Sequence, residues 1–294
     1  MTGDSLSDNG NTFRAAGVPD SRIYWHGRYS DGPNWVDYLQ GDINEKHDVQ
    51  IFNYAYGGAT ACQDITTETF FPFVKNLTSQ IVDVVADVTS GKIPTGNNVK
   101  LVPVQWIGSN DILVALTKAR LNGNMLTDSE IATTVTSLIT CRITGAAALA
   151  RIPGVRDVVL VPLPAIHASP MAPAAMKPMI KQLVTVISQQ MAIAVADLQS
   201  KLDAAKLGVT VHLLGDSSWI ETGMQSVRPP YKTFNTSCFP DPVSTLAKIP
   251  QNHTICNKPT EHLFYDDAHP ETRFHSWFAL KGFLPRMRQL RLLP

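Results

Sequence analysis

The chain has 294 residues, 44% of them hydrophobic and 17% charged, and its 25 Lys and Arg residues balance 25 Asp and Glu. A formal net charge of zero argues against a nucleic-acid groove or an anionic membrane surface as the main partner. The sequence has no low-complexity tract, and its apolar runs are shorter than the ~20 residues that span a bilayer. It therefore predicts a soluble globular protein without stable membrane insertion.

Four short apolar, β-branched runs alternate with longer helical patterns along the chain. We predict strands over residues 49–54, 100–107, 155–161 and 209–214. Alternation of this kind is typical of an α/β fold built on a parallel sheet. The sequence shows no internal repeat and no clear linker, which favours one domain over residues 1–294 with an atypical tail over 276–294.

The segments between the predicted strands divide into helices and loops. Thr127 and Glu130 have the spacing of a capping box, which predicts the start of a helix. Apolar residues recur at helical spacing over residues 179–202 and predict a helix that faces the core. Residues 162–178 are predicted to form a proline-rich loop, and residues 215–261 a long irregular segment.

The cysteines and the glycosylation sequons indicate the cellular compartment in which the protein acts. Four cysteines allow two disulfides in three connectivities: Cys62, Cys141, Cys238 and Cys256. Three Asn-x-Ser/Thr sequons make Asn76, Asn235 and Asn252 candidate glycosylation sites. Two sequons flank Cys238 and Cys256 in one polar stretch, which favours a disulfide between these two cysteines in a glycosylated surface loop. We expect a secreted protein; a bond between Cys62 and Cys141 is left open.

Two polar turns near the ends of the chain have the residue types of a serine hydrolase. A small, glycine-flanked turn can expose the hydroxyl of Ser5 at the mouth of a sheet. A histidine acts as general base for a serine when an acceptor holds its second ring nitrogen, and Asp266 precedes His269 by three residues. Each turn alone is weak evidence for a catalytic site. The same Gly-Asp-Ser tripeptide, for example, recurs at Ser217 after another predicted strand.

Two further turns follow predicted strands. A glycine at position 58 lets backbone approach a bound carbonyl closely, and the amide of Asn110 can donate to an oxyanion. Active sites of open parallel sheets lie outside the carboxyl ends of the strands. Gly58 and Asn110 are therefore candidates for the same site as the two polar turns.

These segments, in this order, resemble the sequence blocks of the GDSL or SGNH hydrolases over nearly the whole chain. The matching residues are 3–8 (Gly-Asp-Ser-Leu-Ser-Asp), 57–60 (Gly-Gly-Ala-Thr), 108–111 (Gly-Ser-Asn-Asp) and 266–270 (Asp-Asp-Ala-His-Pro). Residues 27–39 also resemble a segment common in the secreted lipase and esterase branch. The sequons, the loop between Cys238 and Cys256 and residues 106–111 look most like secreted fungal esterases, which include acetylesterases acting on acetylated sugars.

The resemblance implies a fold and a set of roles. The fold would be a three-layer α/β/α, flavodoxin-like domain with a mostly parallel sheet. Ser5 would be the nucleophile, His269 the general base and Asp266 its orienting acid, while Ser5, Gly58 and Asn110 would bind the oxyanion. The enzyme would act without metal or cofactor, as a monomer, on a small-molecule or oligosaccharide ester.

Other functions fit less well. The eight histidines lack metal-ligand spacing, and no glycine-rich phosphate loop follows a strand. His262 and His275 lack an aspartate three residues upstream, so we expect surface or packing roles for them. Within the family, a lipase or phospholipase is the alternative. Outside catalysis, the alternative is a catalytically dead, truncated relative, either a carbohydrate-binding module or a misfolded fragment.

Two features depart from the family pattern. Glu271 stands where many members have Thr or Ser, a position that we do not expect to carry the chemistry. The first block normally ends an apolar strand, but only Met1 and Thr2 precede Gly3. We expect this strand to lie between the next two strands, so that its truncation leaves unpaired backbone groups. The sequence thus predicts that the native protein begins earlier, with a signal peptide, and that the 294-residue chain folds poorly.

Overall fold

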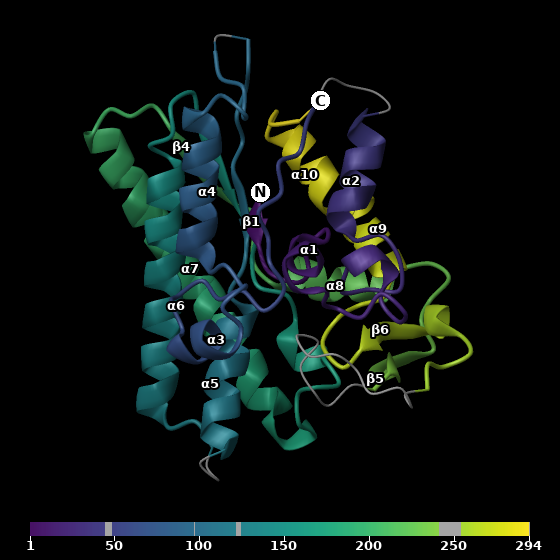
Figure 1. Ribbon diagram of the computed structural model, residues 1–294. Helices are drawn as coiled ribbons and strands as arrows, with labels where there is room; N and C mark the ends of the chain where they lie inside the picture. The colour runs from purple at the N-terminus through teal and green to yellow at the C-terminus, as the bar shows by residue number, and fades with distance from the viewer. Residues whose placement is uncertain (45–48, 97, 122–124, 241–253, 294) are drawn as a thin grey trace. The chain divides into compact units, whose positions relative to one another are not determined.

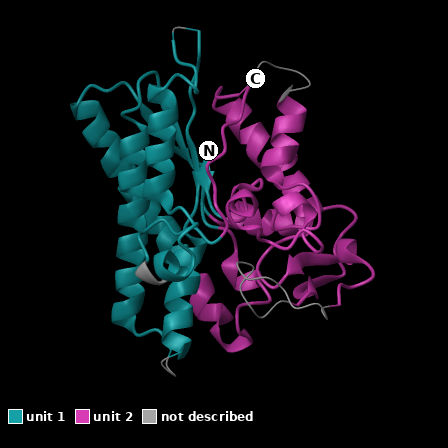
Figure 2. Cartoon of the chain, viewed as in Figure 1, with its two compact units in different colours: residues 1–4, 58–163, 182–216 teal, residues 5–57, 164–181, 217–294 magenta. Residues whose placement is uncertain are grey.

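The computed structural model describes residues 1–44, 49–96, 98–121, 125–240 and 254–293. The chain forms two compact units, each made of three separate stretches (Figure 2). Unit 1 contains Met1–Asp4, Gly58–Leu163 and Gln182–Asp216. Unit 2 contains Ser5–Gly57, Pro164–Lys181 and Ser217–Pro294.

Unit 1 is built on a parallel sheet of four strands in the order β1-β2-β3-β4. The strands are β1 (Thr2–Gly3), β2 (Val104–Trp106), β3 (Asp157–Leu160) and β4 (Thr210–Leu213). Val158, Val159 and Leu160 are completely buried, as expected for a parallel strand covered on both faces. The predicted α/β fold with a mostly parallel sheet is confirmed, and β2, β3 and β4 lie inside three of the four predicted strand segments.

The helices of unit 1 lie beside this sheet (Figure 1). They are α3 (Ile65–Phe70), α4 (Leu77–Thr89), α5 (Ser109–Leu121), α6 (Asp128–Leu149) and most of α7 (Lys177–Ala204). Helix α4 contacts β1, and α6 contacts β3. The predicted capping box is present: the Thr127 hydroxyl accepts from the Glu130 N–H, and the Glu130 carboxylate accepts from the Thr127 N–H.

Two helices are long and apolar enough to cross a bilayer by length and composition. They are residues 128–149 and 174–204, with mean hydropathies of 1.2 and 1.3 over their most apolar windows. Core helices of globular proteins meet the same criteria, so this finding alone carries little weight. The expectation that no segment inserts stably into a membrane stays a prediction.

Strand β1 is only two residues long, yet a side chain completes its hydrogen bonding. The Gly3 N–H donates to Gln80 Oε1, and the Gly3 carbonyl accepts from Gln80 Nε2, both at 2.8 Å. Gln80 lies on α4 and is completely buried. An amide side chain has the same donor and acceptor as a peptide unit, so Gln80 takes the place of a neighbouring strand for Gly3.

The strand predicted over residues 49–54 is wrong, because the structure has no strand there. Side chains take up backbone groups of this stretch instead. The Ile51 N–H donates to Gln40 Oε1 at 3.1 Å, and the Asn11 amide donates to the carbonyls of Asn53 and Ala55 at 3.1 and 2.8 Å. This apolar run therefore forms no strand, and side chains bind several of its backbone groups.

Replacing Gln80 with leucine is expected to destabilise the protein by roughly 2–6 kcal/mol, because two buried backbone groups of Gly3 lose their partner at ~1–3 kcal/mol each. Chemical unfolding monitored by circular dichroism measures the change. Gln190→Leu, on the exposed surface of α7, is the matched control and is expected to change stability by at most about 0.5 kcal/mol. Equal stabilities of the two variants would contradict the role given to Gln80.

Unit 2 contains short helices and a second sheet. In chain order its elements are α1 (Asn11–Ala16), η1 (Trp25–Gly27), α2 (Trp35–Asn44), η2 (Ile166–Ala168), η3 (Ala174–Met176), α8 (Ser218–Ser226), β5 (Thr233–Phe239), η4 (Pro259–Glu261), β6 (His262–Asp266), α9 (Thr272–Trp277), η5 (Phe278–Phe283) and α10 (Leu284–Gln289). Strands β5 and β6 pair in parallel. The prediction that residues 215–261 are irregular is therefore wrong at α8 and β5.

The C-terminal helices bury Phe278 and Phe283 against Trp35 of α2, with ring centroids 5.2 and 5.0 Å apart.

The four cysteines form two disulfides, one in each unit. Cys238 pairs with Cys256, as predicted, and Cys62 pairs with Cys141, the bond that the sequence left open. Among the sequons, Asn76 caps α4 and Asn235 is exposed on β5, while Asn252 lies outside the described residues. Glycosylation stays a prediction.

Candidate active site

Three of the predicted site residues meet within unit 2. His269 Nε2 lies 2.7 Å from Ser5 Oγ, and His269 Nδ1 lies 2.9 and 2.8 Å from the two carboxylate oxygens of Asp266. The three side chains are buried, with exposed fractions of 8% for Ser5, 6% for His269 and 0% for Asp266. A hydroxyl, an imidazole and a carboxylate in this sequence of hydrogen bonds can pass a proton from the serine to the histidine.

The carboxylate of Asp266 is held by donors from two parts of the chain. Its Oδ1 accepts from the backbone N–H groups of Ala268 and His269 at 2.8 and 2.6 Å. Its Oδ2 accepts from the hydroxyl of Tyr24 at 2.7 Å. Burial alone raises the pKa of Asp266, but the charge and hydrogen bond of His269, with the Tyr24 and Ala268 donors, outweigh it and lower that pKa. Asp266 is therefore ionised when it faces the imidazole.

The turn between Asp266 and His269 is set by local backbone geometry. Strand β6 ends at Asp266, and the chain returns so that the Tyr265 N–H donates to the His269 carbonyl at 2.8 Å. A bridge between Phe264 and Pro270 continues this antiparallel return. The spacing of three residues thus places imidazole and carboxylate on one side of a tight turn.

The turn after Ser5 is organised by the buried carboxylate of Asp8. It accepts from the N–H groups of Gly10, Asn11 and Thr12, from the Thr12 hydroxyl, and from the Gly57 N–H at 2.9 Å. Gly57 must be a glycine, because a Cβ there would overlap the hydroxyl of Tyr29 at 2.1 Å. The Tyr29 ring in turn lies 5.1 Å from the His269 ring. Asp8 therefore connects the serine turn to the segment that reaches Gly57.

The two remaining oxyanion candidates, Gly58 and Asn110, belong to unit 1 and lie near each other there. Gly58 has a φ of 78°, and Asn110 Nδ2 donates to the carbonyl of the next residue, Ala59, at 2.8 Å. One N–H of the Asn110 amide remains available after this bond. Asp111 accepts from the N–H groups of Ala61 and Cys62 at 2.8 and 3.0 Å, so the first turn of α5 holds the 59–62 segment.

The rival residues lie elsewhere in unit 2. Ser217 is the N-cap of α8, whereas His269 is bonded to Ser5. His262 Nδ1 lies 3.2 Å from the Thr236 carbonyl, and His275 is 1% exposed. Within the described residues, no group of three or more His, Cys, Asp or Glu side chains has the arrangement of a metal site.

Two tyrosines that contact Asp266 and His269 were not among the predicted site residues. Tyr24 and Tyr29 belong to a segment more than 230 residues upstream, and both are 1% exposed. Residues 27–39 resembled a family segment, and that resemblance was the available clue to Tyr29. Tyr24 lies outside it and was missed.

Removing the Tyr24 hydroxyl is expected to slow the reaction and change its pH dependence. Without this donor the Asp266 carboxylate directs more negative charge toward the imidazole, so the acid limb of the kcat/KM profile shifts to higher pH in Tyr24→Phe. A charge-assisted hydrogen bond contributes ~1.5–3 kcal/mol, of which we expect part, about tenfold, to appear in kcat/KM. Tyr265→Phe is the matched control, because its hydroxyl donates to the Ile23 carbonyl. An equal shift of the acid limb in Tyr24→Phe and Tyr265→Phe would contradict the role given to the Tyr24 hydroxyl.

Glu271 is completely buried beside Tyr231 and Arg273. Its Oε1 accepts from the Tyr231 hydroxyl and lies 3.3 Å from Arg273 Nε. Burial raises the pKa of Glu271 to about 7, although the bonds from Tyr231 and Arg273 oppose the shift. The departure from the family pattern at this position thus places an ionisable group next to the His269-Pro270 turn.

This raised pKa predicts a pH dependence of stability. The folded pKa of about 7 exceeds the unfolded value of 4.5, so the group favours folding below pH 4.5 and loses that contribution as pH rises toward 7. We expect Glu271→Gln to flatten the fall of Tm between these pH values. Thermal scans of both proteins over this range measure it, and parallel Tm curves would exclude Glu271 as the cause.

The sequence profile of the GDSL-like lipase/acylhydrolase family matches residues 1–281. The chain is also 32% identical over 117 residues to the phosphatidylcholine-sterol acyltransferase of Aeromonas hydrophila. That alignment covers 38% of this chain and 32% of the acyltransferase, so it spans about a third of that relative's length.

Proposed function

Because the chain belongs to the GDSL-like lipase/acylhydrolase family, we propose that it is a serine esterase that hydrolyses carboxylic esters through an acyl-enzyme. The family supports a hydrolase or an acyl-transferring enzyme. The observation that carries the proposal is the continuous hydrogen-bond path from Ser5 Oγ through His269 to Asp266.

In the first half-reaction, His269 Nε2 takes the proton of Ser5 as Oγ attacks the ester carbonyl. Asp266 holds the proton on Nδ1 and stabilises the imidazolium that forms. The tetrahedral intermediate collapses when the imidazolium protonates the leaving alcohol, which gives the acyl-serine. In the second half, His269 removes a proton from water, hydroxide adds to the acyl carbon, and Ser5 leaves with its proton restored.

The negative oxygen of each intermediate needs donors. We assign this role to the N–H groups of Ser5 and Gly58 and to the free amide N–H of Asn110. Each such donor typically contributes about 10²–10³ in rate, because it is oriented before charge develops.

The substrate that we propose is a short-chain, acetyl ester of a saccharide. Its support is the resemblance of residues 106–111 and of the sequon-bearing loop to secreted fungal esterases, a group that includes acetylesterases. Two disulfides suit an oxidising compartment, which supports secretion as a proposal.

A second candidate is a lipase, phospholipase or acyltransferase. The observation that favours it is the similarity to a phosphatidylcholine-sterol acyltransferase over 117 residues. In such an enzyme the same acyl-serine would form, and an alcohol in place of water would accept the acyl group.

A chain-length series separates the candidates. We expect kcat/KM to be highest for the acetyl ester among 4-nitrophenyl esters from acetyl to palmitoyl, and acetylated xylo-oligosaccharides to release acetate. Phosphatidylcholine vesicles, with and without an added sterol, test the second candidate. Preference for long acyl chains, or acyl transfer to the sterol, would replace the first proposal with the second.

A further inference from the structure

The ring of Tyr29 packs against the imidazole of His269. The two ring centroids are 5.1 Å apart and the ring planes are tilted by 38°, which is nearer to stacked than to perpendicular. Tyr29 is 1% exposed and His269 is 6% exposed, so the contact is buried. In the proposed mechanism His269 is the side chain that gains and loses a proton. A buried aromatic ring therefore lies against the group whose charge changes during the reaction.

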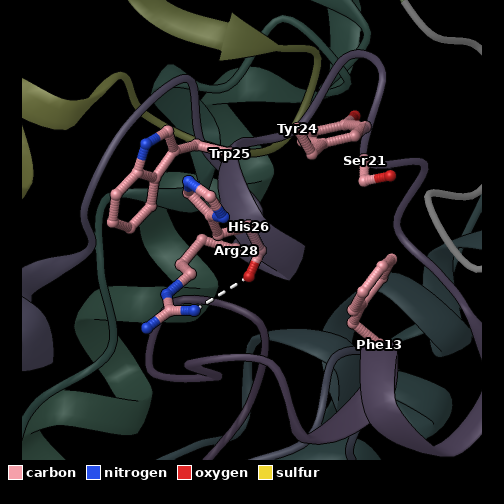
Figure 3. A pocket seen from close by; sticks show the side chains of 6 residues that line it. All are labelled: Phe13, Ser21, Tyr24, Trp25, His26 and Arg28. Atoms are coloured by element: carbon pink, nitrogen blue, oxygen red, sulfur yellow. Dashed lines mark hydrogen bonds between the residues drawn. The ribbon is translucent and has the colours of Figure 1, made fainter.

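Two neighbours fix the position of the Tyr29 ring before any substrate binds. Gly57 lies directly against it, since a Cβ at position 57 would come within 2.2 Å of Tyr29 Cζ. The second neighbour is Tyr24, whose ring centroid is 6.1 Å from that of Tyr29. Tyr24 lines an open hollow next to η1, which Figure 3 shows, whereas Tyr29 does not belong to its lining. The Tyr29 ring is therefore ordered in advance and shielded from solvent.

The imidazolium that forms on His269 needs support at its face as well as at its edge. Its two N–H groups lie in the ring plane and point to Asp266 and Ser5. Hydrogen bonds thus satisfy the edge, while the buried face lacks the water that would solvate its charge. The π face of an aromatic ring attracts a cation that lies within about 6 Å of the ring centroid. The separation of 5.1 Å meets this condition.

Tyr29 acts on this charge as a neutral ring. Burial raises the pKa of Tyr29 well above its ordinary value of 10, and the charges of Asp8 and Asp266 raise it further. Tyr29 therefore carries no negative charge in the pH range in which esters are assayed. What it offers the imidazole is the π face of its ring.

Other ionisable side chains near His269 do not provide this support. Tyr24 donates to Asp266, which binds Nδ1 at the edge of the imidazole. Asp267 and Glu271, on the same turn, accept hydrogen bonds from hydroxyl groups of other residues. His275 on α9 is uncharged at neutral pH, because burial lowers its pKa to about 3 and the charge on His269 lowers it further. Among the described residues, the aromatic ring in contact with the imidazole is that of Tyr29.

We propose that the Tyr29 ring stabilises the imidazolium of His269 by a cation–π interaction in both half-reactions. Tyr29 acts through His269 and is therefore a positioning residue. This inference rests on the proposed esterase mechanism and adds a residue outside the triad and the oxyanion donors. The interaction makes and breaks no covalent bond. It strengthens as a proton passes from Ser5 or from water to His269 Nε2, so it stabilises the transition state more than the resting enzyme.

The first test compares Tyr29→Phe, which keeps the ring, with Tyr29→Leu, which keeps apolar volume without a π face. With 4-nitrophenyl acetate we expect kcat to stay within about threefold in Tyr29→Phe and to fall about tenfold in Tyr29→Leu, with KM within about threefold in both. Because the charged imidazole loses support, the acid limb of kcat/KM moves to lower pH in Tyr29→Leu, by about one pH unit. Tyr24→Phe is expected to move it the other way. An unchanged limb, or one moved to higher pH by water that solvates the imidazolium, overturns the proposal.

Phe283→Leu is the matched control for the loss of a buried ring. Phe283 is 1% exposed, and its ring packs against Trp35 and Phe278. We expect a lower Tm and an unchanged acid limb in this variant. A limb that moves equally in Phe283→Leu and Tyr29→Leu would overturn the proposal.

A second pair of variants keeps the shape of the ring. Tyr29→Phe and Tyr29→pentafluorophenylalanine place rings of nearly the same size at position 29, but the fluorine atoms withdraw electron density and reverse the potential at the ring face. We expect the acid limb to lie at lower pH, and kcat to be lower, in the fluorinated variant. Equal pH profiles would mean that the ring contributes packing alone, which overturns the proposal.

Nuclear magnetic resonance separates this inference from the esterase proposal, because it requires no turnover. The imidazole signals of His269 are followed against pH, and we expect the titration midpoint to be lower in Tyr29→Leu than in Tyr29→Phe and the parent chain. A lower midpoint in a protein that hydrolyses no ester would leave the interaction standing and refute the esterase. Ester hydrolysis with equal midpoints would refute the interaction and leave the esterase.

Discussion

Ser5→Ala is expected to lower kcat for 4-nitrophenyl acetate by about 10⁶-fold, the loss typical of a triad whose nucleophile is removed. The hydroxyl is the group that would bond to the acyl carbon, and water cannot use the same position without it. Ser5 is 8% exposed and its side chain is small, so the substitution is expected to preserve the fold. Initial rates at saturating substrate, with circular dichroism to verify folding, measure the effect.

Ser217→Ala is the matched control, because Ser217 repeats the Gly-Asp-Ser tripeptide at the N-cap of α8. We expect its kcat to stay within about threefold of the parent, as for a surface substitution outside the site. Wild-type rates in Ser5→Ala would overturn the catalytic assignment as a whole. Equal losses of kcat in Ser5→Ala and Ser217→Ala would show that both serines affect folding and that neither acts as the nucleophile.

The parts of the site that could be predicted from sequence are those made by local geometry. Asp266 and His269 are joined by a tight turn whose N–H groups bind the same carboxylate, so a spacing of three residues already implies their contact. The turn of Asp8 is local in the same sense, because residues 10–12 donate to it, although no role was predicted for Asp8. A contact between residues this close in sequence depends on few other residues, so the local sequence is enough to predict it.

The parts that could not be predicted depend on side chains from other segments, which bind backbone groups in place of a neighbouring strand. Residues 49–54 have the composition of a strand, but the side chains of Gln40 and Asn11 take up backbone groups there. Gln80 similarly completes the bonding of Gly3 from a helix. β5 was missed for another reason: its first five residues are exposed or half-buried, so they lack the alternation that predicts a strand.

Tyr24 also could not be predicted from the sequence, because its contact with the candidate site is long-range. Its bond to Asp266 joins residues 242 positions apart, and nothing in its immediate neighbours marks it. Tyr24 packs with Cys238, Phe239 and Tyr265 in one buried cluster. The disulfide between Cys238 and Cys256 therefore lies beside the ring whose hydroxyl donates to Asp266.

Asp266→Asn is expected to lower kcat by about 10⁴-fold, because it reverses the tautomer of His269. The N–H groups of Ala268 and His269 both donate to the Oδ1 position, which therefore must keep an oxygen. The new amide nitrogen then occupies the Oδ2 position and donates to His269 Nδ1. The ring proton moves to Nε2, which faces Ser5 as a donor and cannot accept its proton.

This argument predicts more than a loss of rate. Because the asparagine variant keeps the shape of the site, its KM for 4-nitrophenyl acetate is expected to stay within about threefold while kcat falls. Asp267→Asn is the adjacent control, since Asp267 accepts from the Ser237 hydroxyl and an amide oxygen can still do so. A kcat loss in Asp266→Asn no greater than in Asp267→Asn would mean that the carboxylate does not set the tautomer. His269 would then have to be oriented by its backbone turn alone, with the Tyr24 hydroxyl bonded to a group that takes no part in the reaction.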